Sequence, residues 1–343
     1  MIEARQAVLV EPYKVEIRTV SLPDPQPNQV LIECEASAIS AGTELAVYTG
    51  SHQWLKDPKM TDWKFPFRPG YSAAGTIVAM GSNISGWKVG DRVSYPGNHA
   101  SHELMTVGHE RGRWWNMPAH LPASKAAFAC ISRYGFGGVL RAGITLGRSV
   151  AVMGQGIIGQ FALRSALAAG CYPVIGIDSI AMRRDAAMQA GATATIDPTT
   201  QNVLEVIQSY TKMRGAEIIV DATGIPDAIP KAMALACDAG QVVVVGSPRG
   251  KAAEVNFYDD LHRRYIEVLG AHGNMLFEPF HHRLSGAWDI NKAQTWLLAA
   301  LASNRLSLEG LVRHTITPEQ IGEAYDGLLN NKDEYLGVLV QWK

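Results

Sequence analysis

The segment with the clearest chemistry is a glycine turn at residues 154–159, with the spacing Gly-x-Gly-x-x-Gly. It follows an apolar run at 148–153 and leads into a helix-like run at 160–167. This order of strand, turn and helix suits the pyrophosphate of a dinucleotide: the first glycine permits a tight turn, the second lets the backbone approach the phosphates, and the third lets helix and strand pack closely. The spacing alone is weak evidence, since the chain holds 33 glycines. We expect the cofactor to contact the whole turn: Gly154, Gln155, Gly156, Ile157, Ile158 and Gly159.

A carboxylate follows the turn at the distance that the same cofactor requires. The apolar run 173–177 ends in Asp178, about 20 residues beyond the turn, where a carboxylate accepts hydrogen bonds from ribose hydroxyls. An anion there would repel the 2'-phosphate of NADP, so the sequence favours NAD. Arg183 and Arg184 would attract that phosphate if Asp178 turned away; alternatively, they are solvated helix residues.

Length and composition define the class of protein. A chain of 343 residues with 47% hydrophobic content suits two globular domains. The formal net charge of -1 gives no electrostatic footprint for nucleic acid or an anionic membrane. Because no long apolar stretch and no signal-peptide core are present, we expect a cytoplasmic protein acting on a small molecule. The four cysteines are too scattered for a disulfide framework or a metal knuckle.

The pattern of runs changes along the chain. The first 120 or so residues hold short β-branched runs separated by prolines and glycines, which indicates a β-rich domain. From about residue 124, strands alternate with helical segments, which is typical of a doubly wound parallel sheet. The chain closes on a strand at 337–342, which suggests a return to the first domain. We therefore predict an α/β protein in which residues 1–123 and 273–343 form the β-rich domain and residues 124–272 form the nucleotide-binding domain.

Several segments together resemble the medium-chain dehydrogenase/reductase superfamily, the relatives of alcohol and polyol dehydrogenases. The resemblance covers nearly the full length and implies a GroES-like β domain, a Rossmann domain and a nicotinamide site in the cleft between them. It also implies a homodimer or homotetramer, since relatives commonly pair the edges of their nucleotide-domain sheets. The segments are Pro27–Ile32, Pro69–Gly75, Trp87–Val93, the glycine turn and Gly191–Asp197.

The chain departs from this family at the zinc ligands. Ser40 stands about where the family has a ligand cysteine, and the Gly-His-Glu motif reads Gly70-Tyr71-Ser72. Only Cys130 remains at a ligand-like position, and residues 99–115 lack the cysteines of a structural zinc lobe. We therefore expect a zinc-independent member, because an open catalytic zinc site generally needs three protein ligands. A rival metal set reads better as a polar loop rim: His99, His102, Glu103, His109 and Glu110.

Without zinc, another group must handle the proton of the substrate oxygen during hydride transfer. Tyr71 stands at the family's zinc-histidine position and is either that group or an aromatic plug. Thr43 falls near the family's proton-relay hydroxyl, and His272 lies in the segment that resembles its carboxamide-binding strand end, where it is either an acid/base or a packed hinge residue. With Ser40, these are our catalytic candidates.

The resemblance carries over further cofactor contacts, namely Arg183, Thr223, Gly224, Val245, Gly246, Ser247, Ala271 and His272. Aromatic side chains and hydrogen-bonding groups in the loop 48–65 suit a polyol, cyclitol or sugar-like substrate, whose apolar faces stack on rings. The same tryptophans, with Trp114 and Trp115, could instead cap the β domain. The substrate candidates are Glu44, His52, Trp54, His99 and Tyr134; Glu44 could instead fix its loop by hydrogen bonds.

We thus predict a zinc-independent NAD(H)-dependent oxidoreductase that transfers a hydride between nicotinamide and a secondary alcohol or ketone. One alternative is an NAD(P)H-dependent quinone or enoyl reductase, because zinc-free relatives often reduce activated double bonds. Asp178 argues against it, since those enzymes usually prefer NADPH. A second alternative is a catalytically silent NAD-binding protein.

Overall fold

The computed structural model describes residues 1–109, 111–212, 215–252, 255–273 and 288–343. It divides into two compact units, each described by itself. Unit 1 comprises Met1–Ile131, Gln294–Ser303 and Val312–Lys343; unit 2 comprises Ser132–Ala293 and Asn304–Leu311. The domain boundaries expected from the sequence, at 123/124 and 272/273, differ from these limits and stay a prediction of domain organisation.

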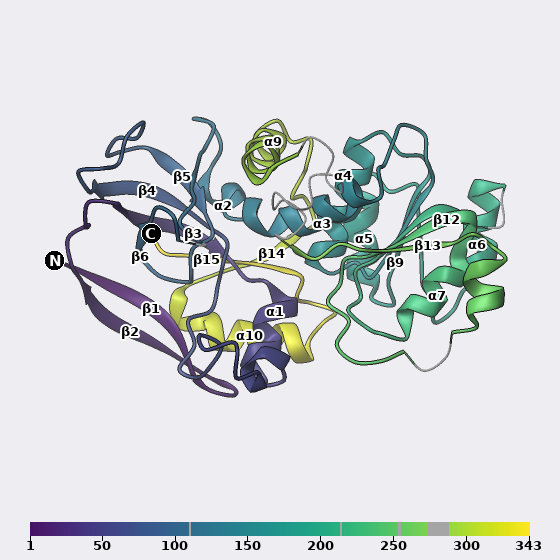
Figure 1. Cartoon of the computed structure of the whole chain (residues 1–343), viewed down its shortest axis with the longest axis horizontal. Coiled ribbons are helices and arrows are strands. Elements are labelled where there is room, and N and C mark those ends of the chain that lie inside the picture. The colour runs from purple at the N-terminus through teal and green to yellow at the C-terminus, as the bar shows by residue number, and fades with distance from the viewer. Residues whose placement is uncertain (110, 213–214, 253–254, 274–287) are drawn as a thin grey trace. The chain divides into compact units, whose positions relative to one another are not determined.

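Unit 1 is built on a mostly antiparallel sheet (Figure 1). Among the described residues, the strand order is β14-β15-β3-β4-β5-β7, with β6 also paired to β3. Alternate residues of β3, Val30, Ile32 and Cys34, pack into one apolar cluster, as the two-residue period of a strand requires. The strands are β3 (Gln29–Ala38), β4 (Ala73–Met80), β5 (Arg92–Tyr95), β6 (His102–Thr106), β7 (Trp115–Asn116), β14 (Val312–Ile316) and β15 (Gly337–Gln341), and a hairpin of β1 (Ile2–Glu11) and β2 (Lys14–Leu22) accompanies them.

A second apolar cluster of unit 1 joins helices to the hairpin and to β15. Leu9, Val47, Tyr325 and Val338 are buried together in it. This packing brings α1 close to α10 although about 280 residues separate them in sequence. The helical elements are α1 (Ala41–Tyr48), η1 (Gln53–Lys56), α2 (Ala123–Ala126), η5 (Pro318–Gln320), α10 (Ile321–Asn330) and most of α9 (Ile290–Ala302).

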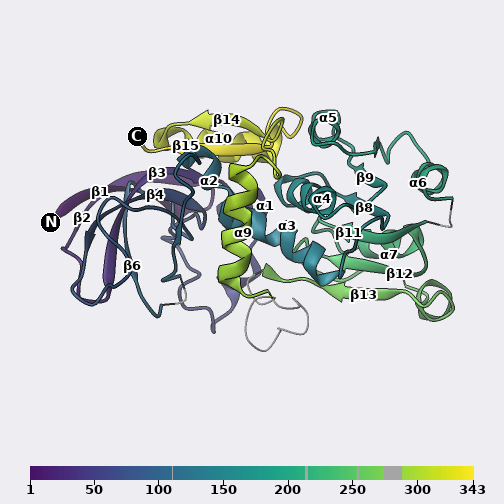
Figure 2. The ribbon, with the colours of Figure 1, turned by 90° about the horizontal axis from the view of Figure 1, so that it is seen from above.

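Unit 2 holds a parallel sheet with the strand order β10-β9-β8-β11-β12-β13, of which Figure 2 shows the part from β9 to β13. The order reverses between β8 and β11, so their carboxyl ends form the switch point where such sheets bind ligands. All residues of β8 and β9 are buried, as expected when helices cover both faces. The strands are β8 (Val150–Met153), β9 (Val174–Ile177), β10 (Ala194–Ile196), β11 (Ala216–Asp221), β12 (Ala236–Val244) and β13 (Glu267–Gly270).

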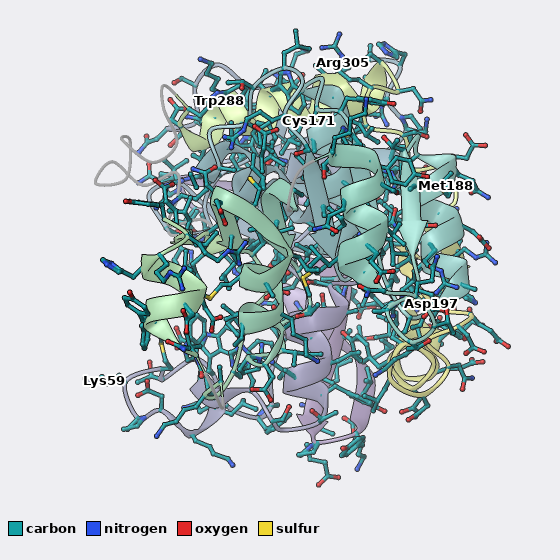
Figure 3. All side chains as sticks on the ribbon, turned by 90° about the vertical axis from the view of Figure 1, so that its right-hand side faces the viewer. Lys59, Cys171, Met188, Asp197, Trp288 and Arg305 are labelled. Atoms are coloured by element: carbon teal, nitrogen blue, oxygen red, sulfur yellow. The ribbon has the colours of Figure 1, made fainter. Side chains whose placement is uncertain are left out.

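Helices cover both faces of this sheet. Residues of α3, α4 and α5 share one apolar cluster with the strands, and residues of α6 and α7 share the other. Ala186 and Ala187 of α5 face inward, whereas Met188 is 47% exposed and directed outward (Figure 3). The helices are α3 (Ala129–Arg141), α4 (Ile157–Ala168), α5 (Ala181–Gln189), α6 (Val203–Thr211) and α7 (Ala228–Leu235), and a π-helical segment, η2 (Phe257–His262), precedes β13.

The fold class expected from the sequence is confirmed: a GroES-like β-rich part and a Rossmann-type parallel sheet. None of the helices in the described part of the chain combines the length and apolarity needed to cross a membrane.

Candidate functional site

The three glycines after β8 have different surroundings. Gly154 has φ +81°, in the left-handed region that favours glycine. A Cβ on Gly156 would have no atom within 4 Å, so the backbone there is open to a ligand. A Cβ on Gly159 would lie 1.8 Å from the carbonyl oxygen of Gly154, which only glycine avoids. The geometry suits the three tasks expected of a pyrophosphate-binding turn, with Gly156 at the N-cap of α4.

Asp178 is fixed at the end of β9 and tied to the glycine turn. Its Oδ2 accepts a hydrogen bond from the backbone N–H of Gln155 at 2.7 Å, and its Oδ1 accepts one from that of Ile180 at 2.9 Å. The residue is 8% exposed. The carboxylate is therefore held beside the turn, where it can receive ribose hydroxyls.

The two arginines beyond Asp178 point to different partners. Arg183 Nη1 lies 3.8 Å from Asp178 Oδ2, and its Nε is buried without a hydrogen-bond partner. Arg184 donates to the backbone oxygen of Asp178 at 2.8 Å and pairs with Asp197 at 3.1 Å. Arg183 therefore stands beside the predicted ribose site, and Arg184 fixes the strand ends.

The neighbouring strands end in closely packed loops. A Cβ on Gly154 would lie 3.1 Å from the Cα of Thr223. Gly246 packs so closely against Gly224 that a Cβ on Gly246 would lie 2.4 Å from the amide nitrogen of Gly224. The predicted residues at these carboxyl ends are thereby assembled at one edge of the sheet. They are Thr223, Gly224, Val245, Gly246, Ser247 and Ala271.

Asp221, which we did not predict from the sequence, organises these loops. Its Oδ1 accepts from the Thr223 backbone N–H at 3.0 Å and from the Thr223 hydroxyl at 2.6 Å. Its backbone oxygen accepts from Val245 and Gly246, both at 2.9 Å. Oδ2 is buried without a partner, and burial raises the pKa of this carboxyl. The signal in the sequence was an acidic residue closing an apolar strand.

In unit 2, the Tyr134 ring lies against Gly273, the residue that follows His272. His272 is exposed just after β13, and a Cβ on the adjacent Gly273 would lie 2.9 Å from the ring of Tyr134. Their roles as acid/base and substrate-pocket residue stay predictions. Asn274, which ends the sequence segment that suggested His272, lies outside the described residues.

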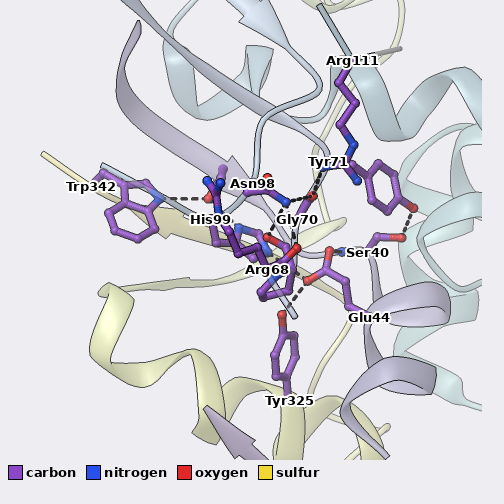
Figure 4. Close-up of polar contacts among 12 residues, drawn as sticks. Ser40, Glu44, Arg68, Gly70, Tyr71, Asn98, His99, Arg111, Tyr325 and Trp342 are labelled. Atoms are coloured by element: carbon purple, nitrogen blue, oxygen red, sulfur yellow. Dashed lines mark hydrogen bonds and ion pairs between the residues drawn. The ribbon is translucent and has the colours of Figure 1, made fainter. Parts of the chain in front are cut away.

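In unit 1, Ser40 and Tyr71 form a hydroxyl pair (Figure 4). Ser40 Oγ and the Tyr71 phenol are hydrogen-bonded to each other. Ser40 is 2% exposed and occupies the N-cap of α1, yet its side chain caps no helix N–H. A serine at an N-cap usually accepts a hydrogen bond from a backbone N–H of the first helical turn. Here the Ser40 hydroxyl bonds to Tyr71 instead. Tyr71 is half-buried.

Glu44 and His99 form a buried pair behind Ser40 (Figure 4). His99 Nε2 lies 2.9 Å from Glu44 Oε2, and His99 Nδ1 lies 2.8 Å from Ser37 Oγ. Ser37 Oγ in turn accepts from the Trp342 indole at 2.9 Å. Glu44, which lies on α1, is thus hydrogen-bonded to the loop that carries His99. Substrate contact by Glu44 and His99 stays a prediction.

The remaining candidate residues of unit 1 lie in different surroundings. Thr43 is half-buried on α1. His52 is buried, accepts from the Trp54 backbone N–H at 3.3 Å, and stacks on Trp63 with ring centroids 4.4 Å apart. Trp114 and Trp115 are buried; Trp114 packs in the core. An aromatic cluster of His52, Trp54 and Trp63 therefore remains as a candidate substrate surface.

The residues at the family's zinc positions do not fit a zinc ion. Proteins bind Zn²⁺ with thiolates, imidazoles and carboxylates, whereas Ser40 and Tyr71 offer hydroxyls that bond to each other. Cys130 Sγ accepts from Gln294 at 3.6 Å and lies 3.9 Å from Ser94 Oγ. Within the described ranges, no group of three His, Cys, Asp or Glu side chains is arranged to hold a metal ion.

The residues of the rival metal set, His99, His102, Glu103, His109 and Glu110, do not share a common centre where they are described; each contacts a different partner. Apart from His99, His102 lies 3.8 Å from Glu33, Glu103 pairs with Arg68 at 3.3 Å, and His109 accepts from the Arg111 backbone. Burial raises the pKa of Glu103 despite nearby arginines and lowers that of His102. Glu110 lies outside the described residues.

Two family models match the chain: the alcohol dehydrogenase GroES-like domain over residues 26–137 and the zinc-binding dehydrogenase over residues 158–290. Among curated proteins, the chain is similar to the L-threonine 3-dehydrogenase of Pyrococcus furiosus, 25% identical over 332 residues and 88% of each chain. It is also similar to the sorbitol dehydrogenase of Bacillus subtilis, 26% identical over 98% of this chain and 96% of that protein.

A solved structure of a candidate zinc-binding dehydrogenase from Sinorhizobium meliloti, bound to NADP, matches the fold. The TM-score is 0.79 at 22% identity, over 99% of this chain and 100% of that one. The two matched domains and the relatives that align along most of the chain show that this protein belongs to the medium-chain dehydrogenase/reductase superfamily, as an alcohol dehydrogenase-like oxidoreductase.

Proposed function

We propose that this chain is a zinc-independent, NAD(H)-dependent oxidoreductase that interconverts a secondary alcohol and a ketone. The observation that carries the proposal is the Ser40–Tyr71 hydroxyl pair at the positions where relatives hold zinc ligands. Asp178 beside the glycine turn supports NAD.

The cofactor fits the residues of unit 2. The open backbone at Gly156 and the N-terminus of α4 would hold the pyrophosphate, and Asp178 would receive the ribose hydroxyls. When bound, the nicotinamide accepts or supplies the hydride. The protein must then handle one proton at the substrate oxygen.

We assign that proton to the phenol of Tyr71. In the direction of alcohol oxidation, Tyr71 acts as the phenolate: its oxygen accepts the hydroxyl proton of the substrate and becomes the phenol, and the Ser40 hydroxyl stabilises the phenolate by donating a hydrogen bond to it. In ketone reduction, Tyr71 donates the proton back. The arrangement supplies by hydrogen bonding the polarisation that a metal supplies in zinc-dependent relatives.

The proposed substrate is a polyol, cyclitol or sugar-like alcohol. Support comes from the aromatic cluster of His52, Trp54 and Trp63, which offers ring faces beside hydrogen-bonding groups. Similarity to a sorbitol dehydrogenase and to a threonine 3-dehydrogenase agrees with an alcohol substrate.

We also propose a dimer that forms through the edge of the parallel sheet. Among the described strands, β13 pairs with β12 alone, and Glu267 and Val268 are exposed on it. An unpaired edge can take a second copy of the same strand. Light scattering of wild type and of Val268→Pro tests this, and a monomeric wild type would refute it.

The catalytic proposal is tested with purified protein, NAD⁺ or NADP⁺, and a panel of polyols, cyclitols and sugars. We expect turnover with less than stoichiometric zinc by metal analysis, and no loss of turnover after chelation. Tyr71→Phe should lower kcat by ~10²- to 10⁴-fold, the range of general acid-base groups, and leave NADH affinity intact. Stoichiometric zinc that is required for turnover would refute the zinc-independent mechanism.

A second panel of ketones, quinones and enones, assayed with NADH or NADPH, distinguishes the alternatives. Turnover of quinones or enones with a strong preference for NADPH would support the reductase, for which Arg183 beside Asp178 is the favourable observation. Cofactor binding without turnover on alcohols, ketones, quinones or enones would support the silent protein.

A further inference from the structure

Glu44 collects hydrogen bonds from three parts of unit 1. It accepts from the Ser40 backbone N–H at 2.8 Å, from His99 Nε2 at 2.9 Å and from the Tyr325 phenol at 2.6 Å. Its side chain is 2% exposed. These donors come from the N-cap of α1, the loop after β5 and α10. Figure 4 shows Glu44 between Ser40 and Tyr325.

Burial of a carboxylate costs free energy, and no Lys or Arg among the described residues pairs with Glu44 to offset that cost. The basic side chain that contacts it is His99. Even when it is paired, a buried charged group contributes little net stability compared with apolar side chains of similar volume. Stability alone therefore gives a weak reason for this group, and its contacts indicate a second reason.

The contact with Ser40 explains why the serine hydroxyl is available. Glu44 accepts from the backbone N–H of the N-cap residue, as the acidic residue of a capping box does, although Glu44 stands one position further into the helix than that motif has it. The reciprocal half of that motif is missing, because Ser40 Oγ bonds to Tyr71 instead of a helix N–H. Glu44 thus fixes the Ser40 backbone and leaves its side chain to Tyr71.

The His99 segment also fixes the backbone next to Tyr71. His99 N–H donates to the Pro69 oxygen at 2.9 Å, and Asn98 Nδ2 donates to the Gly70 oxygen at 2.9 Å. Gly70 has φ +96°, and a Cβ on it would lie 2.6 Å from His99 N, so this approach requires glycine. Residues 98 and 99 therefore hold the Tyr71 loop by their amide groups, while the His99 ring holds Glu44 and, through it, Ser40.

We propose that Glu44, fixed by His99 and Tyr325, is a positioning residue that sets the distance between Ser40 Oγ and the Tyr71 phenol. This inference rests on the proposed function, in which that pair handles the substrate proton. Loss of a donor to Glu44 should loosen the pair and lower kcat, because a misplacement of about 1 Å can cost ~10²-fold in rate. Cofactor binding in unit 2 should not change.

The test uses Tyr325→Phe, which removes one donor and keeps the ring. Its matched control is Tyr48→Phe: the Tyr48 phenol donates to Asp326 at 2.8 Å, and the Tyr48 and Tyr325 rings are 5.1 Å apart. Both variants lose one phenol bond to a carboxylate between α1 and α10. We expect Tyr325→Phe to lower kcat roughly tenfold with an unchanged Kd for NADH, and Tyr48→Phe to keep the wild-type kcat.

A double-mutant cycle separates positioning from a merely structural role. If Glu44 acts through Tyr71, then Tyr325→Phe should cost little further activity in a Tyr71→Phe background. Equal fractional losses in both backgrounds, or a wild-type kcat for Tyr325→Phe, would overturn the inference. A wild-type kcat for Tyr71→Phe would instead overturn the proposed function. Glu44→Gln is a stronger variant; its amide would face a donor, and thermal melting shows whether it folds.

Discussion

Asp178 and Gln155 are joined by a hydrogen bond of 2.7 Å from the backbone N–H of Gln155 to the carboxylate. The two residues lie in loops after neighbouring strands, β8 and β9. The bond fixes the carboxylate relative to the glycine turn before any ligand binds. In the proposed function, the choice between NAD and NADP would depend on this carboxylate, which is already in place.

Removal of this carboxylate should change cofactor preference. In Asp178→Ala, the repulsion of a 2'-phosphate disappears and Arg183, 3.8 Å from Asp178 Oδ2, becomes available to that phosphate. We expect the ratio of Kd values to shift toward NADPH by about tenfold or more, which corresponds to about 1.4 kcal/mol. Fluorescence titration with NADH and NADPH measures it. Asp197→Asn is the control, because Asp197 follows β10 and pairs with Arg184. An equal shift in both variants would contradict the assignment.

Two glycines of the turn should respond oppositely to alanine. Gly159→Ala places a Cβ 1.8 Å from a backbone oxygen, so we expect a loss of about 1–3 kcal/mol in the free energy of unfolding. Gly156→Ala meets no atom within 4 Å and has φ -65°, so the apo protein should be as stable as wild type or up to about 1 kcal/mol more stable.

The same pair separates folding from binding. Gly156→Ala should weaken NADH binding because its Cβ points into the space that we assign to the pyrophosphate. Urea unfolding and calorimetric titration measure the two effects. Unchanged NADH affinity in a folded Gly156→Ala protein would remove Gly156 from the cofactor site.

The sequence predicted the strand, the glycine turn, the helix and the place of Asp178 at a strand end, because the signals for these elements are local. The glycine turn and Asp178 lie within one strand-helix-strand segment, so their spacing alone indicated their arrangement. Asp221 was missed although it also ends an apolar strand, because its role depends on loops from two other strands. That role follows from the order of the strands in the sheet, which cannot be read from the sequence.

The hydroxyl pair of unit 1 was predicted only in part. Ser40 and Tyr71 were singled out by resemblance, but their mutual bond depends on how two loops pack. Tyr325 and Trp342 reach the same region from α10 and the C-terminal end, about 280 and 300 residues away. Hydrophobic periodicity places such residues on elements but gives no partner across that separation.

Asp221 should make stability depend on pH. Burial raises its pKa in the folded state above the ordinary value of 3.8, so the folded protein binds this proton more readily than the unfolded chain. The resulting stabilisation is complete below pH 3.8 and is lost as pH rises through the folded pKa. In Asp221→Asn this loss is absent, so the variant should gain stability relative to wild type as pH increases from 4 toward neutrality.

Asp197 provides a control of opposite sign. Its pKa is lowered, chiefly by a hydrogen bond from the Thr199 side chain, so its contribution is present above the ordinary pKa and is lost as pH falls. Asp197→Asn should therefore lose stability relative to wild type as pH increases toward 3.8, and its curve should run nearly parallel to that of wild type from pH 4 toward neutrality. Urea midpoints at several pH values measure both trends, and parallel curves for wild type and Asp221→Asn would show that Asp221 is not protonated more easily on folding.

Arg164 should prove essential for the attachment of the segment 304–311 to α4. It is buried, its pKa is lowered to about 10 by burial, and it donates to the backbone oxygens of Ser307 at 2.7 Å and Glu309 at 2.9 Å. A lysine cannot reproduce this planar arrangement of N–H donors, so the carbonyls of Ser307 and Glu309 would lose their hydrogen-bond partners. We expect Arg164→Lys to lower the free energy of unfolding by about 3 kcal/mol and to weaken NADH binding, since α4 carries Gly159. Arg141→Lys, at an exposed bond to Gly270, should stay within about 0.5 kcal/mol of wild type. Equal stability of the two variants in urea would show that the segment is held by its apolar contacts instead.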